Sequence, residues 1–143
     1  MKNYDYSVIF DGFTGVTLNG KWGFIDERGS EICEIKYDDV LNFKNGYAGV
    51  GIGGKYGFIN QQGKEICDIK YESVWDFQNG FAPVKLNDKL GFIDMQGKEI
   101  CPIKYDDVTD FFETGYAEVL LGEEEFYIDE NGVEYDCKYI RRK

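Results

Sequence analysis

Apolar and polar residues alternate over short stretches of this 143-residue chain, and turn-forming residues separate the stretches. In the clearest example Ala48, Val50 and Ile52 would point to one side of an extended chain, with glycines between them. Residues 14–18 and 82–86 follow the same period of two. A pair that tolerates positive φ follows each stretch, as two-residue hairpins require: Asn19-Gly20, Gly53-Gly54 and Asn87-Asp88. The pattern predicts a series of β-hairpins.

A second stretch recurs after each of these turns. It reads Lys21-Trp22-Gly23-Phe24-Ile25-Asp26 at first, and it returns from Lys55, from Lys89 and, shortened, as Phe126-Tyr127-Ile128-Asp129. The isoleucines of successive copies are 34, 34 and 35 residues apart, and a glycine follows each copy at positions 29, 63, 97 and 132. A fixed period in this range indicates a repeat architecture.

A third stretch also alternates, so that Cys33, Ile35 and Tyr37 are predicted to face inward. Each unit is therefore predicted to be a three-stranded antiparallel meander of about 34 residues, which needs its neighbours to bury its apolar face. The predicted fold is all-β, with meanders stacked in an open β repeat array; a closed propeller-like ring is the alternative. We expect a single repeat domain, 1–143, with an N-terminal stub 1–9 and units at approximately 10–42, 43–76, 77–110 and 111–143.

Further motifs recur in register, among them Lys36-Tyr37-Asp38-Asp39-Val40 and Gly46-Tyr47-Ala48. Together with the Lys-Trp-Gly-Phe-Ile-Asp copies, they resemble the bacterial WG-repeat (KWG) family over nearly the whole chain. The resemblance implies a β-rich repeat protein, and immunity proteins beside bacterial toxins are among its members. This chain departs from the family pattern because Tyr56 and Leu90 replace the tryptophan, and the fourth unit lacks the Trp-Gly pair.

The net charge of −11 bears on the class of partner. It disfavours nucleic acids and anionic membranes and favours basic proteins. The chain starts without an apolar signal segment and has no apolar run of membrane-spanning length, so we expect a cytoplasmic protein.

The residues that usually carry catalysis are missing. The chain has no histidine and no Cys-x-x-Cys spacing, and the Asp pairs at 38–39 and 106–107 recur with the repeat, as turn-forming residues would. Cys33, Cys67 and Cys101 share one repeat position, which indicates a small buried apolar side chain. We therefore expect no enzyme, no metal site and no cofactor.

Acidic residues crowd into the last unit. Between Asp106 and Asp136 there are twelve acidic residues and no Lys or Arg. A terminal repeat needs a polar outer face, so a solubility cap is one interpretation. A partner interface is the other interpretation. Twelve like charges exceed what solubility requires, and concentrated like charge destabilises the fold through self-repulsion.

Some repeat positions vary while the frame stays fixed, and these are candidates for recognition. The variable sets are Trp22/Tyr56/Leu90/Glu125, Leu41/Trp75/Thr109 and Gly49/Pro83/Glu118. Exposed aromatics beside acidic residues are typical interface anchors, although Trp75 could instead pack between repeats. The predicted partner-binding residues are Tyr56, Trp75, Phe112, Glu113, Glu118, Glu123, Glu124 and Glu125.

These observations predict a non-enzymatic, acidic, protein-binding repeat module with a basic protein partner. The family resemblance extends the prediction to an immunity protein that occludes the active site of a basic, nuclease-type toxin domain. The alternative is a carbohydrate or cell-envelope binding repeat protein that uses Trp22, Tyr56 and Trp75 as stacking platforms.

Overall fold

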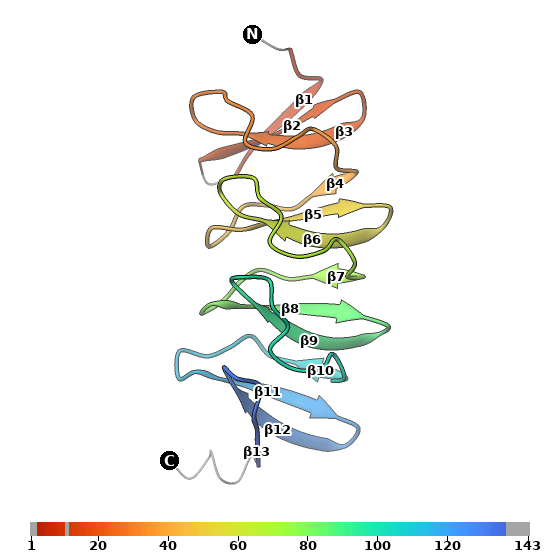
Figure 1. The fold of residues 1–143 in the computed structure, drawn as a ribbon, viewed down its shortest axis with the longest axis vertical. Helices are drawn as coiled ribbons and strands as arrows, with labels where there is room; N and C mark the ends of the chain where they lie inside the picture. Colours follow the sequence, from red (N-terminus) through yellow and green to blue (C-terminus); the bar gives the residue numbers. More distant parts are fainter. Residues whose placement is uncertain (1–2, 11, 137–143) are drawn as a thin grey trace. The chain divides into compact units, whose positions relative to one another are not determined.

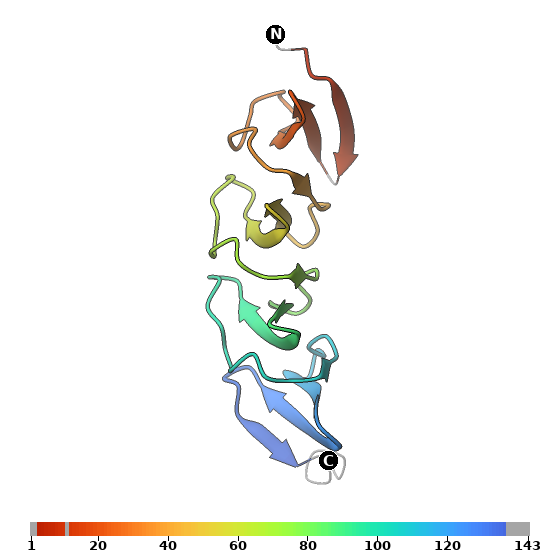
Figure 2. The ribbon, with the colours of Figure 1, turned by 90° about the vertical axis from the view of Figure 1, so that its right-hand side faces the viewer.

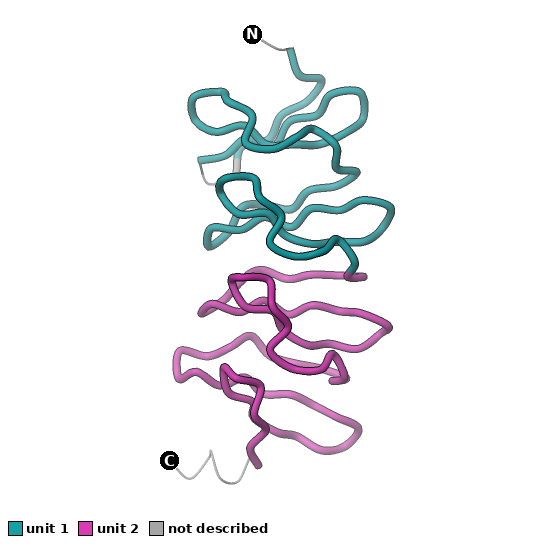
Figure 3. The backbone as a smooth tube through the Cα atoms, in the orientation of Figure 1, with its two compact units in different colours: residues 1–70 teal, residues 71–143 magenta. Residues whose placement is uncertain are grey.

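The computed structural model describes residues 3–10 and 12–136, and within these ranges it contains thirteen strands and no helix. Accordingly, the described part of the chain offers no helix that could cross a membrane. The chain divides into two compact units, residues 1–70 and residues 71–143 (Figure 3). From here on, unit 1 and unit 2 denote these two parts of the chain, and the 34-residue elements are called repeats or copies. Each unit carries two antiparallel sheets.

Unit 1 contains two three-stranded sheets whose strands follow chain order (Figure 1). The first sheet consists of β1 (Tyr6–Phe10), β2 (Phe13–Leu18) and β3 (Lys21–Ile25). The second consists of β4 (Asp39–Val40), β5 (Ala48–Ile52) and β6 (Lys55–Ile59).

Unit 2 contains one three-stranded and one four-stranded sheet, again in chain order. The three-stranded sheet consists of β7 (Ser73–Val74), β8 (Phe81–Leu86) and β9 (Lys89–Asp94). The four-stranded sheet consists of β10 (Asp107–Val108), β11 (Tyr116–Leu121), β12 (Glu124–Asp129) and β13 (Glu134–Asp136). None of the four sheets closes into a barrel, and the prediction of an all-β repeat array is confirmed.

The predicted hairpin turns are confirmed. Both central residues have positive φ at Asn19-Gly20, at Gly53-Gly54 and at Asn87-Asp88, with φ between 52° and 80°. That geometry belongs to the type I′ turn, whose twist matches that of the flanking strands. It fixes the register of β2–β3, β5–β6 and β8–β9.

The repeated Phe-Ile pair and the alternating Val form the core of each unit. In unit 1 the buried cluster includes Phe24, Tyr37, Phe43, Val50 and Ile59. The corresponding cluster of unit 2 consists of Phe92, Cys101, Tyr105, Phe111, Ala117, Val119 and Ile128. Phe58 and Phe92, the counterparts of Phe24 in the next two copies, are buried, with side chains 2% and 0% exposed.

The third strand of the predicted meander is wrong for the first three copies. Residues 31–38 form only isolated bridges, Ile25 to Glu31 and Trp22 to Tyr37, and the next regular strand is the two-residue β4. The alternation still describes burial correctly, since Tyr37 is buried and Lys36 exposed. What prevents a ladder is a crossing: a Cβ added at Gly23 would lie 3.0 Å from the Cα of Ile35. The segment therefore passes over the glycine between its two bridges to β3, and the ladder with the following hairpin begins only at β4.

The last copy does form its third strand. Phe126 occupies the place that Gly23 has in the first copy, and it pairs with Asp136 at the start of the β12–β13 ladder. Figure 2 shows β13 beside β12 at the end of unit 2. The loss of the Trp-Gly pair thus coincides with a continuous third strand.

The three described cysteines are free thiols at one repeat position, but their burial differs. Cys101 is 8% exposed, whereas Cys33 and Cys67 are half-buried. Desolvation by burial raises the pKa of all three thiols. The expectation of full burial is therefore correct for Cys101 only, while Cys137 lies outside the described residues.

Candidate binding face of unit 2

The variable repeat positions come together on one face of unit 2. Trp75, which follows β7, donates its backbone N–H to the carbonyl of Pro83 in β8 at 3.1 Å. Leu90 in β9 is paired with Lys85, two residues further along β8. Residues directly opposite each other in a sheet lie on the same side, and so do alternate residues of one strand. The register therefore places Trp75, Pro83 and Leu90 on the same side of this sheet.

These three residues line a hollow of about 360 Å³, which we call the Trp75 hollow. Its remaining lining comes from the next sheet, through residues 107–110 at and just beyond β10. Trp75 is 46% exposed, a large fraction for a tryptophan. Its side chain does not pack fully against its neighbours, which argues against a purely structural role. The lining thus combines the apolar Trp75, Pro83 and Leu90 with two acidic residues, Asp107 and Asp110.

A second hollow, of about 160 Å³, adjoins the first; we call it the Glu125 hollow. It shares residues 107–109 with the Trp75 hollow, and residues 118–120 and Glu125 complete it. Glu118 and Glu125 come from the same variable sets as Pro83 and Leu90. The Glu118 carboxylate accepts a hydrogen bond from the hydroxyl of Tyr127 at 3.1 Å. Because the two hollows share residues 107–109, we call them together the groove of unit 2; Trp75, Pro83 and Leu90 line its apolar part, and Glu118 and Glu125 its acidic part.

In unit 1, the side chain of Tyr56 fills the place that corresponds to the Glu125 hollow. Tyr56, the counterpart of Leu90 and Glu125, donates its hydroxyl proton to Asp39 Oδ2 at 2.9 Å. Its ring lies over Gly51, where an added Cβ would come within 2.7 Å of Tyr56 Cε1. The Asp39 hydrogen bond raises the pKa of the Tyr56 hydroxyl. Tyr56 was predicted to bind a partner, and the structure gives it this half-buried position against Asp39.

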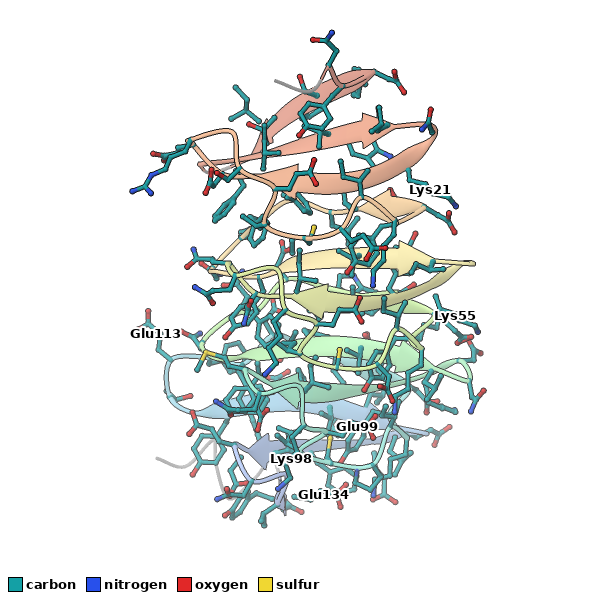
Figure 4. All side chains as sticks on the ribbon, turned by 45° about the horizontal axis from the view of Figure 1, so that its top comes forward. Lys21, Lys55, Lys98, Glu99, Glu113 and Glu134 are labelled. Atoms are coloured by element: carbon teal, nitrogen blue, oxygen red, sulfur yellow. The ribbon has the colours of Figure 1, made fainter. Side chains whose placement is uncertain are left out.

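The other predicted partner-binding residues do not share one surface. Phe112 and Glu113 precede β11, and residues 123–125 follow it, so they lie at opposite ends of that strand (Figure 1). Phe112 is 43% exposed, and Glu113 projects from its loop at one side of the molecule in Figure 4. Glu123 and Glu124 are exposed at the β11–β12 hairpin but line neither hollow. The structure therefore brings Trp75, Glu118 and Glu125 together and leaves the others apart.

Several acidic residues of the last repeat, between Asp106 and Asp136, have a structural partner. Asp106 forms an ion pair with Lys89 and accepts the backbone N–H of Gly122 at 2.7 Å. The Lys89 hydrogen bond lowers the pKa of the Asp106 carboxyl. Asp129 accepts the N–H groups of Asn131 and Val133 across its turn. Part of the acidic charge thus serves the repeat frame, as the recurring Asp of the motif does at Asp38.

The three rings proposed as carbohydrate platforms are not equally exposed. Trp22 is half-buried and makes an edge-to-face contact with Tyr6, with ring centroids 5.9 Å apart. Tyr56 is half-buried against Gly51. Of the three rings proposed for carbohydrate stacking, Trp75 is the one that is exposed.

Sequence reasoning missed several residues of the groove, namely Asp107, Val108 and Asp110 as lining residues. Asp107 and Val108 were hidden because Asp-Asp-Val occurs at the same repeat position in two copies, residues 38–40 and 106–108, and looked purely structural. Leu90 and Pro83 were visible as variable positions but carried no polar chemistry. Only the pairing of β10 with β11 places Asp107 opposite Leu120 and near Glu125.

Metal chemistry gains no support from the geometry. Within residues 3–10 and 12–136, no three His, Cys, Asp or Glu side chains are grouped so that they could hold a metal ion. What the groove offers is an apolar wall, an exposed indole and carboxylates, which suit non-covalent binding.

Comparisons with known proteins address the family and the fold. The family model of the WG containing repeat matches the chain three times, at residues 22–56, 56–89 and 91–123. No curated protein matches it. Among solved structures, "KlHsv2 with loop 6CD replaced by a Gly-Ser linker" is similar, with a TM-score of 0.52 and 13% identity over 86% of this chain. The match covers 48% of that structure, so this chain spans about half its length, and the likeness concerns the fold alone.

Proposed function

The chain belongs to the family of proteins with the WG containing repeat, and we propose that it acts as a protein-binding module without catalytic turnover. In this proposal the repeated residues build the β frame. The variable positions of unit 2 provide the recognition surface for a basic protein.

One observation carries the proposal: the exposed Trp75 lies in a groove that variable repeat positions line. A tryptophan that is half in contact with water is a typical anchor, because burying its ring on association releases a large apolar area from water. Pro83 and Leu90 beside it offer a preformed apolar wall. Such a wall requires little reorganisation when a partner binds.

The charge of the chain supports a basic partner. The net charge is −11, and the stretch from Asp106 to Asp136 contributes no Lys or Arg. Asp107, Asp110 and Glu125 line the two hollows, at the place where a partner would dock. Complementary charge acts mainly on the association rate, whereas buried apolar contacts govern dissociation.

The more specific form of the proposal is an immunity protein. A basic, nuclease-type toxin domain would be drawn to this acidic face and would be inhibited if its active site were covered. The family resemblance and the charge of unit 2 support this form, and a toxin domain encoded beside the chain would be the first partner to test.

The experiment uses a partner protein that the wild-type chain has captured. It measures how fast this partner associates with the wild-type chain and with each of two variants. The test variant reverses three exposed acidic residues of unit 2, Glu123→Lys, Glu124→Lys and Glu125→Lys. The matched control makes the same change in net charge on unit 1, through Glu27→Lys, Glu34→Lys and Asp68→Lys, all at exposed positions. Neither set should alter the fold greatly, because exposed charges contribute little to stability.

We expect the unit 2 reversal to slow association at low ionic strength by about tenfold or more, and the unit 1 reversal to slow it less. High salt should reduce the difference between the two variants. If both variants associate at the wild-type rate, or if the unit 1 variant is slowed as much as the unit 2 variant, the proposed recognition face is wrong.

A further inference from the structure

We propose that the groove of unit 2 holds an extended basic segment of the partner, with an apolar side chain in the Trp75 hollow and a Lys or Arg side chain in the Glu125 hollow. This inference rests on the proposed function and adds the chemistry of the segment that is bound. Its two parts follow from the lining of the two hollows.

The Trp75 hollow is suited to an apolar side chain. Trp75, Pro83 and Leu90 come from consecutive places on one sheet face, and the indole is 46% exposed. Contact with a leucine- or phenylalanine-sized side chain would remove this surface from water, which is the main favourable term in association. Asp107 and Asp110 also line the hollow, so cationic residues should flank the apolar side chain.

The chain itself shows what kind of group completes the second hollow. In unit 1, the Asp39 carboxylate receives a hydrogen bond from the Tyr56 hydroxyl, whose ring crosses over Gly51. In unit 2 the three corresponding residues are Asp107, Leu120 and Glu125, so a carboxylate replaces the donor. Asp107 keeps its Oδ1 contact to the N–H of Val108, at 2.9 Å. The place that the tyrosine donor fills in unit 1 is thus an open, acidic hollow in unit 2, which a cationic donor would complement.

The segment should be extended because the two hollows adjoin. They share residues 107–109, so one partner strand can reach both. Alternate side chains of an extended chain point to the same side, about two residues apart in sequence. A segment in which a basic residue lies two positions from an apolar residue would therefore place one of each in the groove.

The test uses synthetic peptides as probes of the full chain in a Trp22→Phe background. The chain has two tryptophans, so in this variant Trp75 is its only indole. The main probe is an acetylated and amidated heptapeptide of the sequence Ser-Lys-Ser-Leu-Ser-Lys-Ser, in which the two lysines and the leucine lie two positions apart and so point to one side of an extended chain. One comparator replaces the leucine by serine, which keeps the charge, and the other replaces both lysines by glutamate, which keeps the leucine.

We expect the lysine–leucine peptide to shift the Trp75 emission to shorter wavelength in a saturable way. Both comparators should bind at least about tenfold more weakly, because each lacks one of the two contacts. The double variant Asp107→Asn with Glu125→Gln should weaken the lysine–leucine peptide by about tenfold or more. Its matched control, Glu123→Gln with Glu124→Gln, removes the same charge outside both hollows and should stay within about twofold.

Three results would overturn the inference. They are the absence of a saturable change with the lysine–leucine peptide, equal affinity for the serine comparator, and equal weakening in the two double variants. The failure of the proposed function looks different, because it would appear as unchanged binding of the native partner by the Trp75→Ala chain. If binding of the native partner requires Trp75 but the peptides do not bind, the recognition face is correct and the proposal of a basic, extended segment is wrong.

Discussion

Tyr105 donates its hydroxyl proton to Oε2 of Glu134 at 2.6 Å, across the two sheets of unit 2. Lys104 Nζ reaches the same carboxylate oxygen at 3.2 Å. The preceding tyrosines repeat the relationship, from Tyr37 to Glu65 at 2.6 Å and from Tyr71 to Glu99 at 2.7 Å. Figure 4 shows Glu99 and Glu134 on the same side of unit 2. The tyrosine of each Lys-Tyr motif thus binds the glutamate that follows the turn of the next copy.

Replacing Tyr105 by Phe should lower the free energy of unfolding by about 1–2 kcal/mol. The ring would stay in its buried place, since the residue is 1% exposed, but the Glu134 carboxylate would lose one of its two donors and keep Lys104. The loss stays moderate because the Glu134 side chain is 34% exposed and can bind water instead. Urea unfolding measures it, with Tyr6→Phe at a 59% exposed position as the control. Equal midpoints for wild type and Tyr105→Phe would show that the contact contributes nothing.

The same contact predicts a loss of stability at alkaline pH. Burial, and then the hydrogen bond to Glu134, raises the pKa of Tyr105 well above its ordinary 10.0, and burial and Glu65 do the same for Tyr37. Above pH 10 the unfolded chain therefore releases protons that the folded chain keeps, so the free energy of unfolding falls as pH rises. Each such proton contributes a slope of up to about 1.4 kcal/mol per pH unit. Tyr105→Phe should make the decline shallower, and an unchanged slope would contradict the assignment.

Two turn glycines allow the stability cost of backbone strain to be measured separately from the cost of a steric clash. Gly29 and Gly63 share a repeat position and have φ of +82° and +78°. A Cβ at Gly63 would lie 1.7 Å from the carbonyl oxygen of Ile32, whereas a Cβ at Gly29 would meet no described atom within 4 Å. We expect Gly29→Ala to cost about 1–2 kcal/mol, from the left-handed backbone alone. Gly63→Ala should cost about 4 kcal/mol or more, because the Ile32 backbone must move. Equal losses in thermal or urea unfolding would be inconsistent with that contact.

The hairpins could be predicted from the sequence because the same turn signal recurs in three copies of the repeat. Asn19-Gly20, Gly53-Gly54 and Asn87-Asp88 are local signals that depend on backbone chemistry, and tertiary packing had little to add. Phe24, Phe58 and Phe92 share one place in that repetition, and all three are buried.

The third strand failed because alternation reports burial and not pairing. Tyr37 has the burial that the pattern predicts, yet the backbone of Ile35, two residues earlier, crosses Gly23 and does not run beside it as an antiparallel ladder requires. Sequence alone shows a glycine in that place and cannot show which segment approaches it.

The groove was predictable only in part, for a similar reason. Trp75 could be singled out because it differs from Leu41 and Thr109 in the other copies. The hollow around it depends on residues from β8, β9 and β10, which the register brings together. The count of acidic residues could not distinguish Asp106, which is paired with Lys89, from Asp107, which lines both hollows.

The core should respond to truncation more strongly than the exposed rings. Phe92 is 0% exposed and packs edge-to-face on Phe111, with ring centroids 4.9 Å apart. Phe92→Ala should cost about 3–5 kcal/mol, from lost burial and the cavity left behind. Phe112→Ala, at a 43% exposed position, should cost less than about 1 kcal/mol. Similar urea midpoints for the two variants would mean that the packing of unit 2 is described wrongly.

The central claim is that the exposed Trp75 anchors a partner in the groove of unit 2. The measurement that tests it most directly is the dissociation constant of the captured partner for Trp75→Ala and for Leu41→Ala, its repeat counterpart in unit 1. Leu41 is 36% exposed, so both variants truncate an exposed apolar side chain at one repeat position. We predict that Trp75→Ala weakens binding by about thirtyfold or more, as the loss of an anchor of about 2 kcal/mol would, and that Leu41→Ala leaves it within about twofold. Equal dissociation constants for the two variants would contradict the claim.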